Sequence, residues 1–189
     1  MYRYFPLLIL LLVSCSNQRQ PEQKNEVPAD SGIEVQSPSG HFTIALPPDF
    51  PTPEADTQFI TTASDDTISM YTYISEINRG ICIFGSNEYS STTFAQQTPD
   101  NMLDNALNGA LRQWSARLSE SKPFIKNGGK GVSFWFVSKM DGKDLYGRFD
   151  YLLSKPRMYQ VGFLSHDKSE ILKPDIQKYF GSLAVPVRQ

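Results

Sequence analysis

The chain has 189 residues, with 18 Lys and Arg against 20 Asp and Glu, which gives a formal net charge of −2. This length suits one domain with a sizeable core rather than two. The charge is nearly balanced and no basic tract occurs, so we expect no nucleic-acid partner. Two cysteines are too few for a framework of disulfides.

The N-terminus has the pattern of a bacterial export signal. Arg3 precedes an apolar run over residues 5–13, which is far shorter than the roughly 20 residues that span a bilayer and is therefore typical of a cleaved signal peptide. Residues 12–15, Leu-Val-Ser-Cys, resemble the lipobox of bacterial lipoproteins. The resemblance implies a signal peptide over residues 1–14 and acyl chains such as palmitate on Cys15, the site of lipidation, which anchor the protein in the membrane.

An ordinary secretory signal that happens to end in cysteine is the alternative to a lipobox. Ser16 stands where an Asp in Gram-negative lipoproteins often marks retention in the inner membrane. We therefore expect attachment to the outer membrane, facing the periplasm. Residues 15–37 are predicted to be the acylated cysteine and a disordered tether, because Gln, Asn, Glu, Pro and Ser dominate and cannot bury a core. About 20 such residues reach roughly 25 Å.

The single folded domain is predicted to occupy residues 38–189 and to begin with a strand. Phe42, Ile44 and Leu46 alternate with smaller residues before two prolines, which is the period of a half-buried strand. The same signals predict three more short antiparallel strands, over residues 57–63, 67–74 and 80–84.

The clearest helix signals begin at Thr98. Thr98 suits the N-cap, Pro99 the first helical position and Asp100 the positive end of the helix dipole. Apolar residues then recur at threes and fours as far as Leu118, which predicts a helix over residues 99–118 with one apolar stripe. The polar residues 85–97 are predicted to be irregular, and are either a functional loop or a simple lead into the helix.

A meander of three long strands is predicted next, over residues 132–140, 143–153 and 158–165. The first places large apolar residues on both faces, so both faces of the sheet need cover. Asp141 followed by Gly142 is a strong signal for a two-residue hairpin turn. A second helix is predicted over residues 169–181, with either an irregular first turn or a start at Pro174, and a short strand at residues 183–185.

These patterns together resemble the PsbP-like superfamily over residues 38–187. The resemblance rests on an early element with Phe42, Ile44, Leu46, Pro47 and Phe50, then a helix, the meander, a closing strand with Tyr159 and Val161, and a terminal helix that ends Phe180-x-Ser182-Leu183. It implies an α+β fold in which an antiparallel β-sheet is covered by helices on both faces, an α-β-α sandwich.

The same resemblance bears on function. Members of the superfamily include a photosystem accessory protein, a nuclear-transport protein that binds a small GTPase, and envelope lipoproteins of bacteria, and they act mostly by binding other proteins. Some photosynthetic members bind metal ions. No matching ligand set is found in this sequence, so no metal site is carried over.

No motif predicts catalysis, a metal site or a cofactor. Ser165, His166 and Asp167 are the residue types of a catalytic triad, but neighbours on an extended chain point in opposite directions. Cys82 lies in an apolar run and is predicted to be a buried thiol. Residues 127–131 and 141–144 are predicted to be turns, because they lack the spacing of a phosphate loop or the ligands of a calcium loop. Four carboxylates could supply a catalytic pair, but their spacing singles out no two of them: Glu76, Glu88, Asp104 and Asp150.

We therefore predict a lipid-anchored cell-envelope protein that is not an enzyme and that binds a protein partner as an accessory or assembly factor. Two alternatives stay open. The first is a carrier that holds a small apolar ligand in a cavity between the sheet and the helix that begins at Pro99. The second is an envelope hydrolase with titratable groups that converge near residues 85–97.

Overall fold

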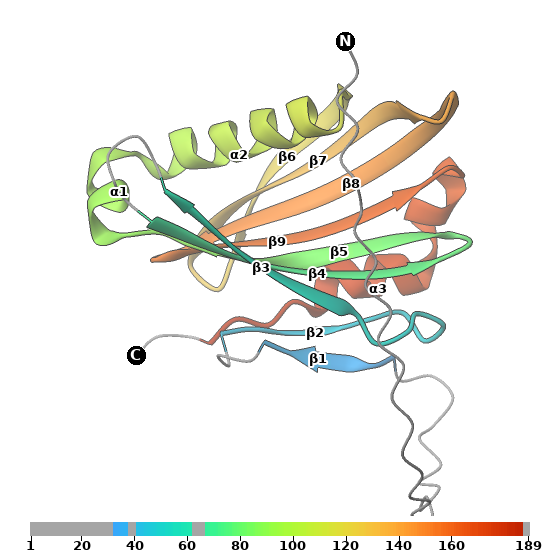
Figure 1. Cartoon of the computed structure of the whole chain (residues 1–189), viewed down its shortest axis with the longest axis horizontal. Coiled ribbons are helices and arrows are strands. Elements are labelled where there is room, and N and C mark those ends of the chain that lie inside the picture. Colours follow the sequence, from blue (N-terminus) through green and yellow to red (C-terminus); the bar gives the residue numbers. More distant parts are fainter. Residues whose placement is uncertain (1–31, 38–40, 62–66, 187–189) are drawn as a thin grey trace, which may run out of the picture.

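The computed structural model describes residues 32–37, 41–61 and 67–186 (Figure 1). The predicted signal peptide, Cys15 and most of the predicted tether lie outside these residues. Within them, no helix is both long and apolar enough to span a membrane.

Seven antiparallel strands form the main sheet in the order β3-β4-β5-β9-β8-β7-β6, so β3 and β6 are its two edges. The strands are β3 Glu54–Thr61, β4 Thr67–Ile77, β5 Gly80–Glu88, β6 Arg117–Lys126, β7 Gly129–Met140, β8 Lys143–Ser154 and β9 Arg157–Ser165. Asp141 and Gly142 take φ angles of 52° and 77°, as a two-residue hairpin turn requires. The predicted meander and its hairpin are confirmed.

Strand β6 is not predicted by the sequence patterns, and it takes residues that were assigned to a helix. Helix α2, Pro99–Gln113, begins as predicted, because the side chain of Thr98 accepts a hydrogen bond from the N–H of Asn101. The helix ends early because Ser115 takes a φ of 46°, which turns the chain into β6. The assignment of Leu118 to the helix is therefore wrong.

The segment over residues 85–97 is more regular than predicted. Strand β5 continues to Glu88, and helix α1, Ser91–Gln96, follows with Ser90 as its N-cap. The side chain of Ser90 accepts a hydrogen bond from the N–H of Thr93 at 3.1 Å. The prediction of an irregular segment is therefore wrong for most of its length.

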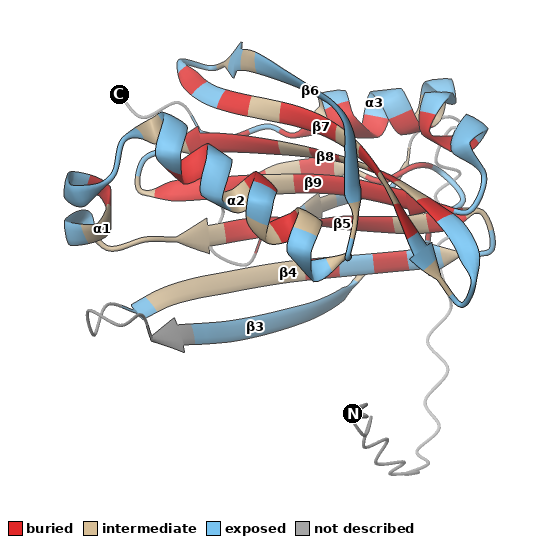
Figure 2. Cartoon of the chain, turned by 90° about the horizontal axis from the view of Figure 1, so that it is seen from above, coloured by how far each residue is buried: buried red, intermediate tan, exposed pale blue. Residues whose placement is uncertain are grey.

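Helix α2 packs across β7 and β8 and covers this part of one face of the sheet (Figures 1 and 2). Met102, Leu103 and Leu107 are its large buried residues. They join the aromatic side chains of β7 and β8 in a cluster that we call the α2-side core, whose other members include Phe134, Phe136, Phe149 and Tyr151. The apolar stripe predicted for this helix is confirmed at these positions.

The opposite face is closed by a mixed layer. It consists of strands β1 (Glu34–Gln36) and β2 (Thr43–Ala45), the 3₁₀ helix η1 (Lys168–Leu172) and helix α3 (Pro174–Ser182). These elements enclose the α3-side core, which includes Phe42, Phe50, Cys82, Phe84, Phe163, Ile176 and Tyr179. Helix α3 begins at Pro174, the second of the two predicted starts.

The prediction that helices cover both faces of the sheet, as in an α-β-α sandwich, is wrong. In the part of the chain that the structure describes, strands make up 52% and there are only three short α-helices. Helix α3 has nine residues, and at 1.5 Å per residue it is about 14 Å long, which is too short to cover seven strands that lie about 4.8 Å apart. The small β1–β2 sheet and the loop with Leu46 and Phe50 fill the remaining area.

Two chain segments differ from their predicted structure at the ends of the domain. Residues 34–36, predicted to be the end of the tether, form β1, which pairs with β2 through Val35 opposite Ile44. The strand predicted at residues 183–185 is reduced to one bridge between Thr43 and Ala184.

Phenylalanine rings cover glycines on the neighbouring strand in the half of the sheet that contains β6 to β9. A Cβ atom added to any of these glycines would lie 2.3 Å from a ring atom, so the rings rest directly on the backbone. Such pairs fix the register of a sheet. The pairs are Phe124 on Gly131, Phe136 on Gly147 and Phe149 on Gly162.

Candidate functional site

Of the residues singled out in the sequence, Cys15 lies outside the described residues, and Cys82 is buried as predicted. Cys82 is 0% exposed in the α3-side core, and burial raises the pKa of its thiol far above the ordinary range. A thiol that stays protonated is a poor nucleophile. The structure therefore gives Cys82 a packing role.

Ser165, His166 and Asp167 do not converge on one another. The hydroxyl of Ser165 donates to the carbonyl of Arg79 at 2.7 Å, and His166 Nδ1 lies 2.8 Å from the carbonyl of Asp144. Asp167 accepts hydrogen bonds from Ser169, which lower the pKa of its carboxyl group. Each side chain thus interacts with a neighbouring group of the fold, and the nucleophile–base contact of a triad is not formed.

The carboxylates noted in the sequence lie on four different elements. Glu88 Oε1 is 2.9 Å from Arg157 Nη2, and Asp150 Oδ2 is 2.9 Å from Arg148 Nη2. These two acids are therefore held in ion pairs. Within the described ranges, no three of the His, Cys, Asp and Glu side chains group in a way that would hold a metal ion.

The space between the sheet and α2, which the carrier alternative requires, is filled with side chains. Leu103 and Leu107 are 5% and 9% exposed, and Phe134 is fully buried beneath them. The rings of Phe134 and Phe149 stack with centroids 5.9 Å apart. This interface is packed as a protein core is packed.

The end of β5 and helix α1 are also packed. Phe94 of α1 is buried, its ring centroid lies 5.8 Å from that of Tyr89, and Lys155 Nζ lies 5.7 Å from the Phe94 ring centroid. The N–H of Tyr89 donates to the carbonyl of Pro156 at 3.0 Å. Burial raises the pKa of the Tyr89 hydroxyl. These contacts explain why the segment is ordered.

A charged cluster around Arg79 joins the β4–β5 turn to the layer that contains α3. Arg79 Nη2 lies 2.6 Å from Asp49 Oδ1 and contacts Asp175, and Arg79 Nη1 lies 3.3 Å from Glu170 Oε2. The hydrogen bond from Arg79 lowers the pKa of the Asp49 carboxyl group. The guanidinium also lies 5.2 Å from the Phe50 ring centroid. This arrangement is suited to holding the chain together.

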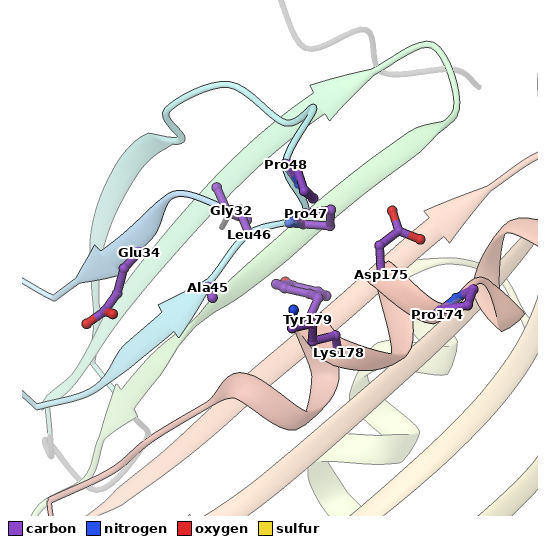
Figure 3. Close-up of a pocket in the computed structure, with 10 residues that line it drawn as sticks. All are labelled: Gly32, Glu34, Ala45, Leu46, Pro47, Pro48, Pro174, Asp175, Lys178 and Tyr179. Atoms are coloured by element: carbon purple, nitrogen blue, oxygen red, sulfur yellow. The ribbon is translucent and has the colours of Figure 1, made fainter. Parts of the chain in front are cut away.

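Beside this cluster is a pocket of about 520 Å³ between β2 and α3 (Figure 3). Leu46, Pro47 and Pro48 line one side, and Asp175, Lys178 and Tyr179 of α3 line the other. The Tyr179 hydroxyl donates to the carbonyl of Ile83 at 3.0 Å inside the core, and burial raises its pKa well above the ordinary value. The reactive end of Tyr179 thus faces the sheet, and the pocket presents mainly its ring.

A larger depression lies between α2 and the edge strand β6, and we call it the α2–β6 groove. Its volume is about 730 Å³. Leu103, Pro123 and Val132 contribute to its lining, and Ile125 of β6, which is 79% exposed, stands at its edge. Charged residues Asp100, Asp104 and Lys130 also line it. Lys130 Nζ is 3.0 Å from Asp100 Oδ1.

A second depression, the Trp135 hollow, lies on the other face of β6. Trp135 points away from α2 because it alternates with Phe134 and Phe136 along β7. The hollow has a volume of about 410 Å³, and its lining includes Trp135, Tyr146 and Leu172. Leu172, on η1, is 69% exposed. Both faces of the β6 edge therefore carry a surface depression with an exposed apolar residue.

Arg148 fixes the inner wall of the Trp135 hollow. Its guanidinium carbon lies 3.9 Å from the ring centroid of Phe180 and 5.1 Å from that of Trp135. It donates to both carboxylate oxygens of Asp150, at 3.1 and 2.9 Å, and to Gln177 Oε1 at 2.8 Å. A guanidinium held by two rings and by three hydrogen bonds has little freedom. Trp135 is thus presented on a rigid wall.

We compared the chain with known proteins. No family model and no curated protein sequence matches it. Among solved structures, a cyanobacterial PsbP (CyanoP) from Synechocystis is 10% identical with a TM-score of 0.56, over 88% of this chain and 98% of that chain. LpqN, involved in cell envelope biogenesis of Mycobacterium tuberculosis, is 14% identical with a TM-score of 0.49, over 82% and 90%. A protein of unknown function from Pseudomonas aeruginosa is 11% identical with a TM-score of 0.49, over 83% and 98%.

The likeness to the Synechocystis structure shows that the chain has the PsbP-like fold. At this level of identity it shows the fold alone. The predicted resemblance is confirmed for the fold, with the correction that a mixed layer and not a helical one closes the second face.

Proposed function

We propose that the protein is a lipid-anchored protein of the bacterial cell envelope, without a catalytic role, that binds a protein partner through the α2–β6 groove. The observation that carries the proposal is Ile125, which is more exposed than any other large apolar side chain that the structure describes and stands beside a depression of about 730 Å³. A single exposed apolar residue is ordinary on a protein surface, but one joined to a large depression marks an interaction site.

The charges around the groove specify part of the partner's chemistry. Asp100 and Asp104 supply two carboxylates, whereas Lys130 supplies one ammonium group that already pairs with Asp100. The groove is therefore acidic at Asp104. A matching partner segment places an apolar side chain against Leu103 and Ile125 and a Lys or Arg side chain near Asp104.

The Trp135 hollow supports the same function, since it lies behind the groove on the other face of β6. Its exposed residue Leu172 and its rigid Trp135 wall add apolar area to the same edge of the molecule. Aromatic residues that are held in place lose little entropy on binding and are frequent anchors of protein interfaces. A partner that reaches around β6 contacts both depressions.

A protein partner explains the groove better than the two alternatives do. A carrier encloses most of its ligand, whereas the enclosed space between α2 and the sheet is filled by Phe134, Leu103 and Leu107. A hydrolase near residues 85–97 needs converging titratable groups, whereas Glu88 pairs with Arg157 and Tyr89 packs against Phe94. The groove at β6 is an open surface with an exposed apolar residue.

The partner is tested with a photo-crosslinking residue at position 125 in the intact, acylated protein. We expect a reproducible adduct with one envelope protein, and we expect Ile125→Asp to abolish co-purification of that protein. Ile33→Asp is the matched control, since Ile33 is 40% exposed and precedes β1, in the layer on the other face of the sheet. The proposal of a partner at the groove is contradicted if no envelope protein is enriched in the adducts above background. It is also contradicted if both variants reduce co-purification equally.

The anchor is tested separately by Cys15→Ala, because that change removes the acylation site and lies outside the described domain. We expect the variant to leave the membrane fraction with an unchanged melting temperature, and the wild-type protein to sediment with outer-membrane density. A variant that still sediments with lipid contradicts the anchor. Sedimentation of the wild-type protein with the inner membrane contradicts only the location.

A further inference from the structure

Strand β3 belongs to the sheet, but none of its described side chains is buried. Residues 54–59 are all exposed, although they point alternately to the two faces (Figure 2). The strand is held by eight consecutive pairs with β4, from Glu54 opposite Ile74 to Thr61 opposite Thr67. Among the strands that the structure describes, the sheet ends at β3, so the backbone N–H and C=O groups of alternate residues point away from β4 along this edge.

The other edge of the sheet is protected in ways that β3 is not. Strand β6 contains Pro123, which lacks an N–H, has a register irregularity between Leu118 and Glu120, and carries Lys122 and Lys126. Proteins use these devices to keep an edge from pairing with foreign strands. The segment Glu54–Thr61 has no Pro, Lys or Arg, and its register with β4 is unbroken.

We propose that β3 is a strand-addition site, along which an extended segment of a second protein, with Lys or Arg at alternate positions, pairs through its main chain. The site lies at the opposite edge from the α2–β6 groove, so it goes beyond the proposed function and stands independently of it. In strand addition, main-chain hydrogen bonds give the affinity and alternate side chains give the selectivity.

Charge specifies the occupant. Glu54 and Asp56 are two residues apart and therefore lie on the same face of β3, and both are exposed. Asp56 Oδ2 accepts a hydrogen bond from Gln58 Nε2 at 2.7 Å, which restrains the carboxylate on this face. Opposite charges directly across a ladder stabilise pairing. On the other face Phe59, 69% exposed, offers an apolar contact.

A second copy of the chain is a weaker fit than a basic strand. If the β3 strands of two copies pair, the only charged side chains that they bring together are acidic. An antiparallel pairing centred on Ala55 places Glu54 of one copy directly opposite Asp56 of the other. Like charges in that position are destabilising. A strand with Lys at alternate positions avoids this repulsion in the registers that place Lys opposite Glu54 and Asp56.

The probe is an eight-residue peptide with Lys at two alternate positions and Thr or Val elsewhere, added to the intact acylated protein in detergent. The control peptide has Glu in place of each Lys. Hydrogen exchange measured by mass spectrometry is expected to show that the Lys peptide slows amide exchange at residues 54–61 and that the Glu peptide does not. Exchange at residues 117–126 is expected to be unchanged with either peptide. Equal effects of both peptides, or protection at residues 117–126, overturn the proposal.

Two kinds of variant separate charge from main-chain pairing. Asp56→Lys is expected to weaken binding of the Lys peptide about tenfold, which corresponds to about 1.4 kcal/mol, and to strengthen binding of the Glu peptide. Of Thr57→Pro and Gln58→Pro, one removes an N–H that faces β4 and lowers the melting temperature, and the other removes an outward N–H. The variant that keeps its melting temperature is expected to lose the peptide.

The proposal is overturned if Asp56→Lys leaves the preference between the peptides unchanged. It is also overturned if the proline variant that keeps its melting temperature binds the Lys peptide as wild type does. Protection of residues 54–61 that rises with protein concentration in the absence of peptide assigns the edge to a second copy and overturns the basic strand. Ile125→Asp is expected to leave peptide binding unchanged.

Discussion

The two edges of the sheet are attached to the molecule by different means. Strand β6 is fastened by a ring that rests on its neighbour, Phe124 on Gly131, and it borders α2 and the Trp135 hollow. Strand β3 buries none of the side chains described at residues 54–59 and relies on its ladder with β4. The two edges therefore expose different groups: β6 borders two depressions, and β3 exposes the main chain of an edge strand.

The largest expected difference between the two halves of the sheet is in the cost of removing one aromatic ring. Phe134 is 0% exposed beneath α2, whereas Phe59 is 69% exposed on β3. Phe134→Ala is therefore expected to lower the free energy of unfolding by about 3–5 kcal/mol, and Phe59→Ala to change it by less than about 0.5 kcal/mol. Urea unfolding of both variants measures this. A similar loss for both would show that β3 packs on the core.

A smaller effect is expected where a methyl group is forced under a ring. Phe136 is 1% exposed and cannot move away from Gly147, so Gly147→Ala is expected to cost about 1–3 kcal/mol. Gly131→Ala is expected to cost less, because the half-buried Phe124 at the edge can swing outward. The order of the two unfolding free energies tests whether β6 is the looser end of the ring-covered half.

Gly109→Ala is the control for these glycine changes. Its Cβ atom would meet nothing within 4 Å, and it lies inside α2. The change is expected to stabilise the protein by about 0.5–1 kcal/mol, since alanine restricts the unfolded chain and favours the helix. Loss of stability at all three positions would mean that backbone strain, and not contact with the rings, decides the outcome.

The sequence predicts the parts of the fold that local signals control. Asp141-Gly142 marks its hairpin because both residues take positive φ angles, and Thr98-Pro99 marks the start of α2. The end of α2 is not visible, because Leu118 continues the apolar spacing past the reversal at Ser115. Strand β6 is missed because none of its residues is buried, so it has no period of two.

The second layer and the groove depend on contacts between distant segments. Strand β1 has one apolar residue, Val35, between Glu34 and Gln36, which looks like tether until β2 lies beside it. The groove forms where the first turns of α2 approach β6 and β7, and no spacing in the sequence joins Leu103 to Ile125. The turn predicted at residues 127–131 is the only local signal in the sequence for β6, because a hairpin turn is preceded by a strand.

The smallest effect expected concerns the chain that leads into β3, which is held partly by charge. Arg79 lowers the pKa of Asp49 below its ordinary value of 3.8, and Ser75 Oγ donates to the carbonyl of Pro51 at 2.7 Å. A carboxyl group whose folded pKa is depressed stabilises the protein above its unfolded pKa, and this contribution is lost as the pH falls through the folded pKa.

We therefore expect Asp49→Asn to be less stable than wild type at pH 7 and equally stable once the pH is well below 3.8. The effect is small because the Asp49 side chain is 52% exposed and water screens the ion pair. Urea unfolding of both proteins between pH 7 and pH 2 measures the difference, which cancels the titration of groups common to both. In an Arg79→Met background the same comparison should depend much less on pH, because the largest cause of the lowered pKa of Asp49 is gone. A difference that persists in that background would assign the effect to the backbone hydrogen bond of Asp49 and to the charge of Lys173, which also lower the pKa of its carboxyl group.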